Sequence, residues 1–218
     1  MRRFFSHSIP VTPWRAKHQW SLSPARSIIL TAGLILFGIG DGFLIASHLG
    51  NAPWSVLSQG ISLRTGISIG WATFLVSSLV LLLWIPFKQR PGVGTLANIA
   101  VIAIAIDLTV AWMPTPTHLA SRVGLIFVGI ALVGAGSALY LTCGLGPGPR
   151  DGLMTAIHYS SGVSVARVRA GIESSVLLLG WLLGGRVGLG TLLFAFGIGA
   201  SVALWLTLVG HLTENTPQ

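Results

Sequence analysis

The chain has 218 residues, of which 52% are hydrophobic and only 8% are charged, and its formal net charge is +8. About a quarter of the residues of an ordinary soluble domain are charged, so this composition excludes a water-exposed surface of the usual kind. It predicts a protein whose solvent is the lipid bilayer.

The positive charge is concentrated at the N-terminus. Five basic residues precede the first apolar run, namely Arg2, Arg3, Arg15, Lys17 and Arg26. Basic flanks of this kind stay on the cytoplasmic side of a membrane and meet anionic lipid, so we assign the charge to topology and expect no nucleic-acid partner. Residues 1–26 are predicted to form a cytoplasmic tail that either lies against the membrane surface or is disordered.

Six apolar segments are long enough to cross a hydrocarbon core of about 30 Å as helices. They cover about residues 27–48, 69–87, 93–113, 122–143, 164–184 and 188–210. The first exceeds the apolar region of a cleavable signal peptide, so we expect it to be retained as an anchor. The predicted fold class is all-α, a polytopic bundle of about six transmembrane helices.

Two shorter helices are predicted after the first and fourth long segments. They cover about residues 53–64 and 149–161. Pro53 and Pro149 stand where such a helix can begin. Gly66 and Gly162 stand where it can end. Both are shorter than the roughly 20 residues of a straight crossing, which favours re-entrant or half helices.

An internal repeat relates the two halves of the chain. Residues 49–102 match residues 145–198 at a constant shift of 96, with about a third of the positions identical. The matches include the Leu-Gly-x-x-Pro turns that begin at Leu49 and Leu145. Apolar sequence of low complexity does not match by chance at such turn residues, held at one spacing. A slightly shorter shift pairs Gly33-Leu34-Ile35 with Gly124-Leu125-Ile126 in the preceding helix.

The second copy can be inverted or parallel. If the short helices are re-entrant, each copy crosses three times and the second copy is inverted, as in several transporter folds. If they cross the membrane, the copies are parallel. Inversion leaves three of the 13 basic residues outside, namely Arg64, Arg122 and Arg186. The parallel arrangement leaves about four outside, so the charge pattern favours inversion.

The predicted organisation has four parts. They are a basic tail (1–26), a first membrane repeat (27–118), a second membrane repeat (119–211) and a C-terminal tail (212–218).

The most specific stretch is the turn Cys143-Gly144-Leu145-Gly146-Pro147-Gly148-Pro149-Arg150-Asp151-Gly152-Leu153. It resembles the corresponding turn of the YczE/YyaS/YitT-type bacterial membrane proteins, and the similarity covers nearly everything after residue 26. The resemblance implies a multi-pass protein of the bacterial plasma membrane from a largely uncharacterised family. It implies no catalytic residues and no substrate.

Acidic side chains within the apolar segments are candidate functional residues, since a charge at the centre of a bilayer costs about 2.5–3.5 kcal/mol. Asp41 lies in the middle of the first segment, Asp107 towards the end of the third and Glu173 within the fifth. The functional interpretation is a proton-titrating or cation-binding site in the bundle interior. The alternative is an acid that is paired or capped for structural reasons alone.

Arg150 and Asp151 stand at the start of the second short helix, where the first copy has Trp54 and Ser55. Free N–H groups and the positive end of the helix dipole can bind an anion there, with Arg150 as the fork that fixes it. Alternatively, Asp151 caps the helix and Arg150 only sets topology.

His48 and His158 flank the two turns and can relay protons, although histidines without a role are more common at a membrane interface. Cys143 is predicted to be a small packing residue. No group of His, Cys, Asp and Glu has metal-ligand spacing, so neither a metal nor a cofactor is expected.

These features favour a small secondary transporter or permease of unknown solute, such as a small anion, with Asp41 or Glu173 carrying the coupling ion. The alternative is a non-transporting accessory or assembly protein that supports a membrane-associated complex. An enzyme is not expected, and no oligomeric state is predicted. Convergence of Asp41, Arg150, Asp151 and Glu173 on one cavity would favour transport, and a solid apolar core would favour the accessory role.

Overall fold

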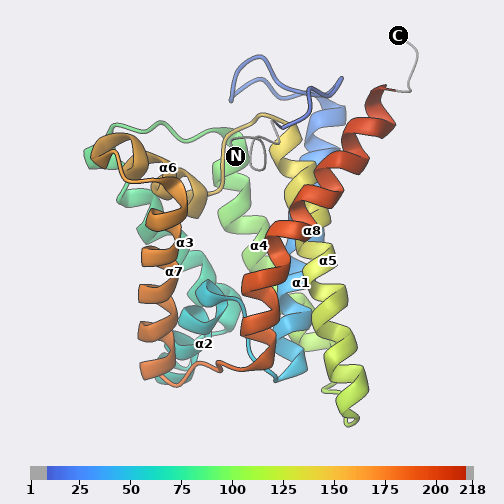
Figure 1. The fold of residues 1–218 in the computed structure, drawn as a ribbon, viewed down its shortest axis with the longest axis vertical. Coiled ribbons are helices and arrows are strands. Elements are labelled where there is room, and N and C mark those ends of the chain that lie inside the picture. The colour runs from blue at the N-terminus through green and yellow to red at the C-terminus, as the bar shows by residue number, and fades with distance from the viewer. Residues whose placement is uncertain (1–8, 215–218) are drawn as a thin grey trace, which may run out of the picture.

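A computed structural model describes residues 9–214 (Figure 1). Over this range the chain forms eight α-helices, one short 3-10 helix and no strand. The α-helices are α1 (Pro24–Ser47), α2 (Pro53–Thr65), α3 (Ile69–Leu82), α4 (Val93–Trp112), α5 (Leu119–Thr142), α6 (Pro149–Ser161), α7 (Val165–Leu182) and α8 (Leu189–Glu214). The predicted all-α class is confirmed for these residues, whereas Arg2 and Arg3 lie outside them.

The two short helices form as predicted. α2 and α6 each have 13 residues and begin with a proline, Pro53 and Pro149, in their first turn. They end at Gly66 and Gly162, whose φ angles are 78° and 71°. This left-handed conformation costs glycine little because it has no Cβ, so glycine stops the helix cleanly.

Five helices are long and apolar enough to cross a membrane. They are α1, α3 extended by the 3-10 turn Ile85–Phe87, α4, α5 and α8. The predicted crossing at 164–184 corresponds to α7, which carries three charged residues, Arg167, Arg169 and Glu173. Length and apolarity alone therefore identify five spans in the described chain.

α1 and α5 cross in close contact through glycines. A Cβ atom on Gly33 would lie 2.9 Å from the carbonyl oxygen of Gly136, and one on Gly40 would lie 2.6 Å from that of Gly129. Residue numbers rise along α1 as they fall along α5, so the two helices run antiparallel (Figure 1). Small residues permit this close approach of two backbones.

The glycine contacts also show a relation at the shift of 96. Gly33 meets Gly136, and Gly40 meets Gly129, so each residue of one contact lies 96 positions from a residue of the other. Gly124, which the sequence pairs with Gly33, lies away from this crossing, because a Cβ on it would meet nothing within 4 Å. The pairing of Gly33 with Gly124 as repeat equivalents stays a prediction.

The Gly/Pro turns before the short helices make matching backbone contacts. The amide of Gly94, at the start of α4, donates to the carbonyl of Leu145 over 2.8 Å. The amide of Gly190, at the start of α8, donates to the carbonyl of Leu49 over 2.9 Å. In addition, α2 packs against α7 and α6 packs against α3. Each half thus positions the short helix of the other.

The halves differ in how their last two long helices pack. α3 packs along α4, but packing of comparable extent is absent between α7 and α8. Asp107 of α4 holds the start of α3, where it accepts from the Gly70 amide over 2.6 Å and from the Ser68 hydroxyl over 2.5 Å. The position equivalent to Asp107 is Ala203, which cannot make such a contact. Asp107 is therefore explained as a structural contact.

The N-terminal segment packs on the protein from residue 9 onward. The Thr12 hydroxyl donates to the Thr142 carbonyl over 3.1 Å, and the Ala16 amide donates to the Cys143 carbonyl over 2.8 Å. Thr12 is buried. The expectation of a disordered tail is not met for residues 9–23, which cover the end of α5.

Candidate functional site

A cavity of about 360 Å³ lies between the two halves. All eight α-helices contribute residues to its lining. Four of the predicted site residues, Asp41, Arg150, Asp151 and Glu173, line this one cavity. Residues that are up to 132 positions apart in sequence are thereby brought to a single place.

The lining follows the shift of 96. Eight pairs of lining residues are related by it: Phe37 and Val133, Asp41 and Ser137, Ala52 and Gly148, Trp54 and Arg150, Thr73 and Arg169, Ser77 and Glu173, Asn98 and Phe194, Ile102 and Ile198. The first half contributes neutral side chains at most of these positions, and the second half contributes most of the charge. The cavity therefore has equivalent walls with unequal chemistry.

Asp41 is held in the wall by α1, where glycines on both sides let neighbouring helices approach. Its side chain is almost fully buried, and Oδ2 accepts from the Ser55 hydroxyl over 2.6 Å. Oδ1 has no hydrogen-bond partner among the described residues. An unsatisfied buried polar atom costs about 1–3 kcal/mol, and more when it is charged. This oxygen can therefore bind a proton or a cation, or accept a hydrogen bond from the N–H group of a ligand.

Arg150 lies in the first turn of α6, across the cavity wall from α2. Its guanidinium carbon lies 4.9 Å from the centre of the Trp54 ring, a cation–π contact. A tryptophan near a helix end is typically an anchor at the membrane interface, yet the Trp54 ring is buried and lines the cavity. The two residues, 96 positions apart, thus join α6 to α2 at the wall of the cavity.

Asp151 accepts from the hydroxyl of Tyr140 over 2.9 Å, which links α6 to α5. The predicted capping role is wrong, because Gly148 is the N-cap residue of α6 and no side chain caps this helix. Asp151 still lies in the first turn, where the helix dipole favours a negative charge. Each half thus supplies the cavity with one aspartate that accepts from a hydroxyl group: Asp41 from Ser55 and Asp151 from Tyr140.

Glu173 forms an ion pair with Arg169 one turn earlier on α7, with 2.9 Å between Nε and Oε1. Both residues line the cavity. The two opposite charges neutralise each other, which explains how α7 can carry both on the side that lines the cavity.

The two histidines lie elsewhere. His48 ends α1, where its ring nitrogens contact Arg186 over 2.5 Å and Thr115 over 3.1 Å. Burial lowers the pKa of His48, and the nearby charges of Arg186 and Arg122 lower it further. The Nδ1 atom of His158 contacts the Val163 carbonyl over 2.6 Å. Neither histidine lines the cavity, so the proton relay predicted for them has no geometric support there.

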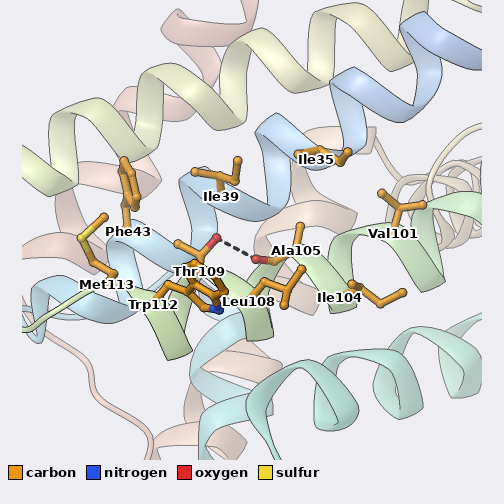
Figure 2. Close-up of a pocket in the computed structure, with 10 residues that line it drawn as sticks. All are labelled: Ile35, Ile39, Phe43, Val101, Ile104, Ala105, Leu108, Thr109, Trp112 and Met113. Atoms are coloured by element: carbon orange, nitrogen blue, oxygen red, sulfur yellow. Dashed lines mark hydrogen bonds between the residues drawn. The ribbon is translucent and has the colours of Figure 1, made fainter.

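A larger hollow of about 460 Å³ lies between α1 and α4 (Figure 2). Its lining is almost entirely apolar, and the hydroxyl of Thr109 is occupied by the carbonyl of Ala105 over 2.7 Å. Ile104, Leu108 and Trp112 are exposed along it. No titratable group lines this groove, so we assign it to the lipid-facing surface.

Several residues of the cavity were not predicted from the sequence. Tyr140, Ser137 and Arg169 were not singled out, and Ser55 was noted only as the equivalent of Asp151. The shift of 96 is the signal that could have found them: it maps Asp41 onto Ser137 and Ser55 onto Asp151, so an acid and a hydroxyl exchange places. Tyr140 carries no such signal.

A family model described as a family of unknown function, DUF6198, matches residues 24–207. The chain belongs to this family. An uncharacterized protein of Haemophilus influenzae is 49% identical over 204 residues, which is 94% of each chain. The uncharacterized membrane protein YczE of Bacillus subtilis is 31% identical over 166 residues, 75% of this chain and 77% of its own.

The uncharacterized protein YyaS of Bacillus subtilis is 27% identical over 165 residues, 74% of this chain and 82% of its own. The resemblance to the YczE and YyaS proteins predicted from the Gly/Pro turn is thus confirmed. No solved structure matches the chain. Together with the apolar helices, these relatives identify a membrane protein of the DUF6198 family.

Proposed function

We propose that this DUF6198 protein is a small secondary transporter whose solute binds in the central cavity. The observation that carries the proposal is the gathering of Asp41, Arg150, Asp151 and Glu173 on one cavity between the two halves. Transporters built from repeats place their solute and coupling-ion sites at such an interface. An accessory protein needs no cavity of this kind.

The proposed topology is a pair of inverted repeats with six crossings. Its support is the antiparallel contact of the equivalent helices α1 and α5. α7 is the proposed sixth crossing, because its Arg169 and Glu173 are paired and face the cavity. α2 and α6 are proposed to be re-entrant, with Pro53 and Arg150 of their first turns both lining the cavity.

The proposed location is the bacterial plasma membrane, with a cytoplasmic N-terminus. Arg122 and Arg64 support this orientation, because they bind the carbonyls of Ser47 and Leu183, where α1 and α7 end. Lysine and arginine are favourable at the ends of helices, where carbonyls are free. Arg122 and Arg64 therefore have a role at helix ends on the proposed outer face. Few other basic residues lie on that face, as the positive-inside rule requires.

The unequal packing of the halves supplies a basis for alternating access. We expect the arrangement of α3 on α4 and that of α7 and α8 to exchange as the cavity opens to the other side. Equivalent elements can adopt each other's conformation because their turns and glycine contacts are the same.

Asp41 is the proposed binding group for a proton or for a positively charged group, since its Oδ1 atom is buried and unpartnered. The groups that face it across the cavity are Arg150 and Asp151 of α6 and the Arg169–Glu173 pair of α7. Arg150 is the proposed contact for a negatively charged part of the solute.

Metabolite profiling of a deletion strain tests the proposal. We expect one small solute to be displaced inside or outside the cells, to be restored by the wild-type gene and to remain displaced with Asp41→Asn. Asp107→Asn is the matched control, because asparagine can still hold the start of α3 and lies outside the cavity. An unchanged profile, or an Asp41→Asn strain that matches wild type at equal abundance, would contradict transport through this site.

A further inference from the structure

The cavity holds one buried acceptor and one cation that are both without a polar partner. Asp41 Oδ1 makes no hydrogen bond, and its residue is 2% exposed. The guanidinium of Arg150 rests on the Trp54 ring and, within residues 9–214, makes neither a hydrogen bond nor an ion pair. The guanidinium is half-buried and offers five N–H donors, so it can donate to a molecule in the cavity.

The other charged groups of the wall each have a polar partner. Asp151 accepts from Tyr140, and Glu173 pairs with Arg169, each over 2.9 Å. Among the charged groups of the cavity, Asp41 therefore has the one buried oxygen without a partner, and Arg150 has no hydrogen bond or ion pair within residues 9–214.

These two groups are neighbours that do not pair with each other. The Asp41 carboxylate is 2.6 Å from the hydroxyl of Ser55, which follows Trp54 in the chain, and the Trp54 ring carries Arg150. Neither a hydrogen bond nor an ion pair joins Asp41 to Arg150 within residues 9–214, and both line the same cavity, so one molecule in it can contact both.

The charge of the cavity restricts that molecule. Three carboxylates and two guanidinium groups line it, namely Asp41, Asp151, Glu173, Arg150 and Arg169. The net charge of −1 is offset by the positive ends of α2 and α6, which contribute about half a charge each. A free anion would leave Asp41 unpaired and a free cation would leave Arg150 unpaired. A molecule that carries one positive and one negative charge pairs with both groups and leaves the net charge of the cavity unchanged.

We propose that the solute is a zwitterion of the α-amino-acid type, with its carboxylate on Arg150 and its ammonium group on Asp41. This inference rests on the proposed transport function and names its substrate class. The planar fork of Arg150 matches a carboxylate, and an ammonium group supplies the donor that Asp41 Oδ1 lacks. Phe37, Val133 and Ile198 line the same cavity, so its walls favour an apolar side chain.

The test is a binding experiment on the purified full-length protein in detergent. The common L-amino acids are screened by thermal stabilisation, and the strongest binder is compared with its analogues that lack one charge. For leucine these are 4-methylpentanoate, without the amine, and 3-methylbutylamine, without the carboxylate. We expect an apolar amino acid to bind and each analogue to bind at least tenfold more weakly, because each leaves one buried charge unpaired.

Two variants test which residue binds which charged group of the solute. Asp41→Asn should remove the advantage of leucine over 4-methylpentanoate, and Arg150→Ala should remove its advantage over 3-methylbutylamine. A purely structural role of either residue would weaken all three probes equally and would overturn the assignment. Asp107→Asn, the same chemical change outside the cavity, should leave the preferences unchanged.

The proposal is overturned if no amino acid binds at millimolar concentration, or if 4-methylpentanoate binds as well as leucine in the wild type. Its failure can be separated from that of the transport function. If metabolite profiles still depend on Asp41 while no amino acid binds, then only the substrate class is wrong. If the profiles do not depend on Asp41, the transport function fails as well.

Discussion

Replacing Gly40 by alanine should destabilise the protein through the α1–α5 crossing. The added Cβ would lie 2.6 Å from the Gly129 carbonyl oxygen and 2.8 Å from the Val133 amide nitrogen. The first distance is about 0.8 Å shorter than the 3.4 Å at which ordinary contact begins. Both neighbours are backbone atoms and cannot rotate away, so the helices must separate.

Overpacking of this kind costs about 1–3 kcal/mol. In a chain of this size, 1 kcal/mol lowers the melting temperature by about 2–4 °C. Gly136→Ala should cost a similar amount, because Gly136 is the equivalent of Gly40 and meets the backbone of Gly33.

Gly124→Ala is the matched control on α5. Its Cβ would meet nothing within 4 Å, and alanine is a better helix former than glycine. Thermal unfolding of the purified variants in one detergent measures all three. If Gly40→Ala and Gly136→Ala melt with wild type, or if Gly124→Ala loses as much stability as they do, the proposed crossing and its register of 96 are refuted.

Four further outcomes are expected. Trp84→Phe should lower the unfolding free energy by about 0.5–1.5 kcal/mol, because the indole N–H loses the Pro149 carbonyl that it binds over 2.9 Å; an unchanged denaturation midpoint would contradict this. Burial raises the pKa of the Cys143 thiol to about 11, so maleimide labelling of the folded protein at pH 8 should be far slower than after unfolding, and equal rates would disprove it. The pKa of His48 lies below 6.5 in the folded state, so stability should fall as the pH drops below about 6.5, and His48→Gln should lose this dependence when melting is followed against pH. Arg150→Lys should impair restoration of the metabolite profile at normal abundance, because an ammonium group does not reproduce the planar fork, whereas full restoration would leave Arg150 a topology charge only.

Much of the fold was predictable because its signals are local. Pro53 and Pro149 start the short helices and glycines end them, and each of these effects depends on the backbone of one residue. The register of α1 against α5 was not predictable in this way. Glycine is common in both helices, so Gly33 matched Gly124 by type, whereas the crossing brings Gly33 against Gly136.

The candidate site was predictable only in part. The cost of a charge in a bilayer marked Asp41 and Glu173, and the Gly/Pro turn marked Arg150. Their convergence depends on packing between the two halves, which no single segment encodes. Trp54 illustrates the difference, since a tryptophan near a helix start is typical of a membrane interface, whereas here α6 places Arg150 on its ring.

A transporter of this kind opens its cavity to each side of the membrane in turn, and the labelling of one cavity cysteine measures this. In a Cys143→Ala background, Ser137→Cys places a thiol in the cavity wall, and Phe196→Cys places one on the exposed outer face of α8. Membrane vesicles of both orientations are treated with an impermeant maleimide. We expect the cysteine at position 137 to react in both orientations and the one at position 196 in neither; a cysteine at position 137 that reacts in neither orientation, at normal abundance, would refute the proposed transport.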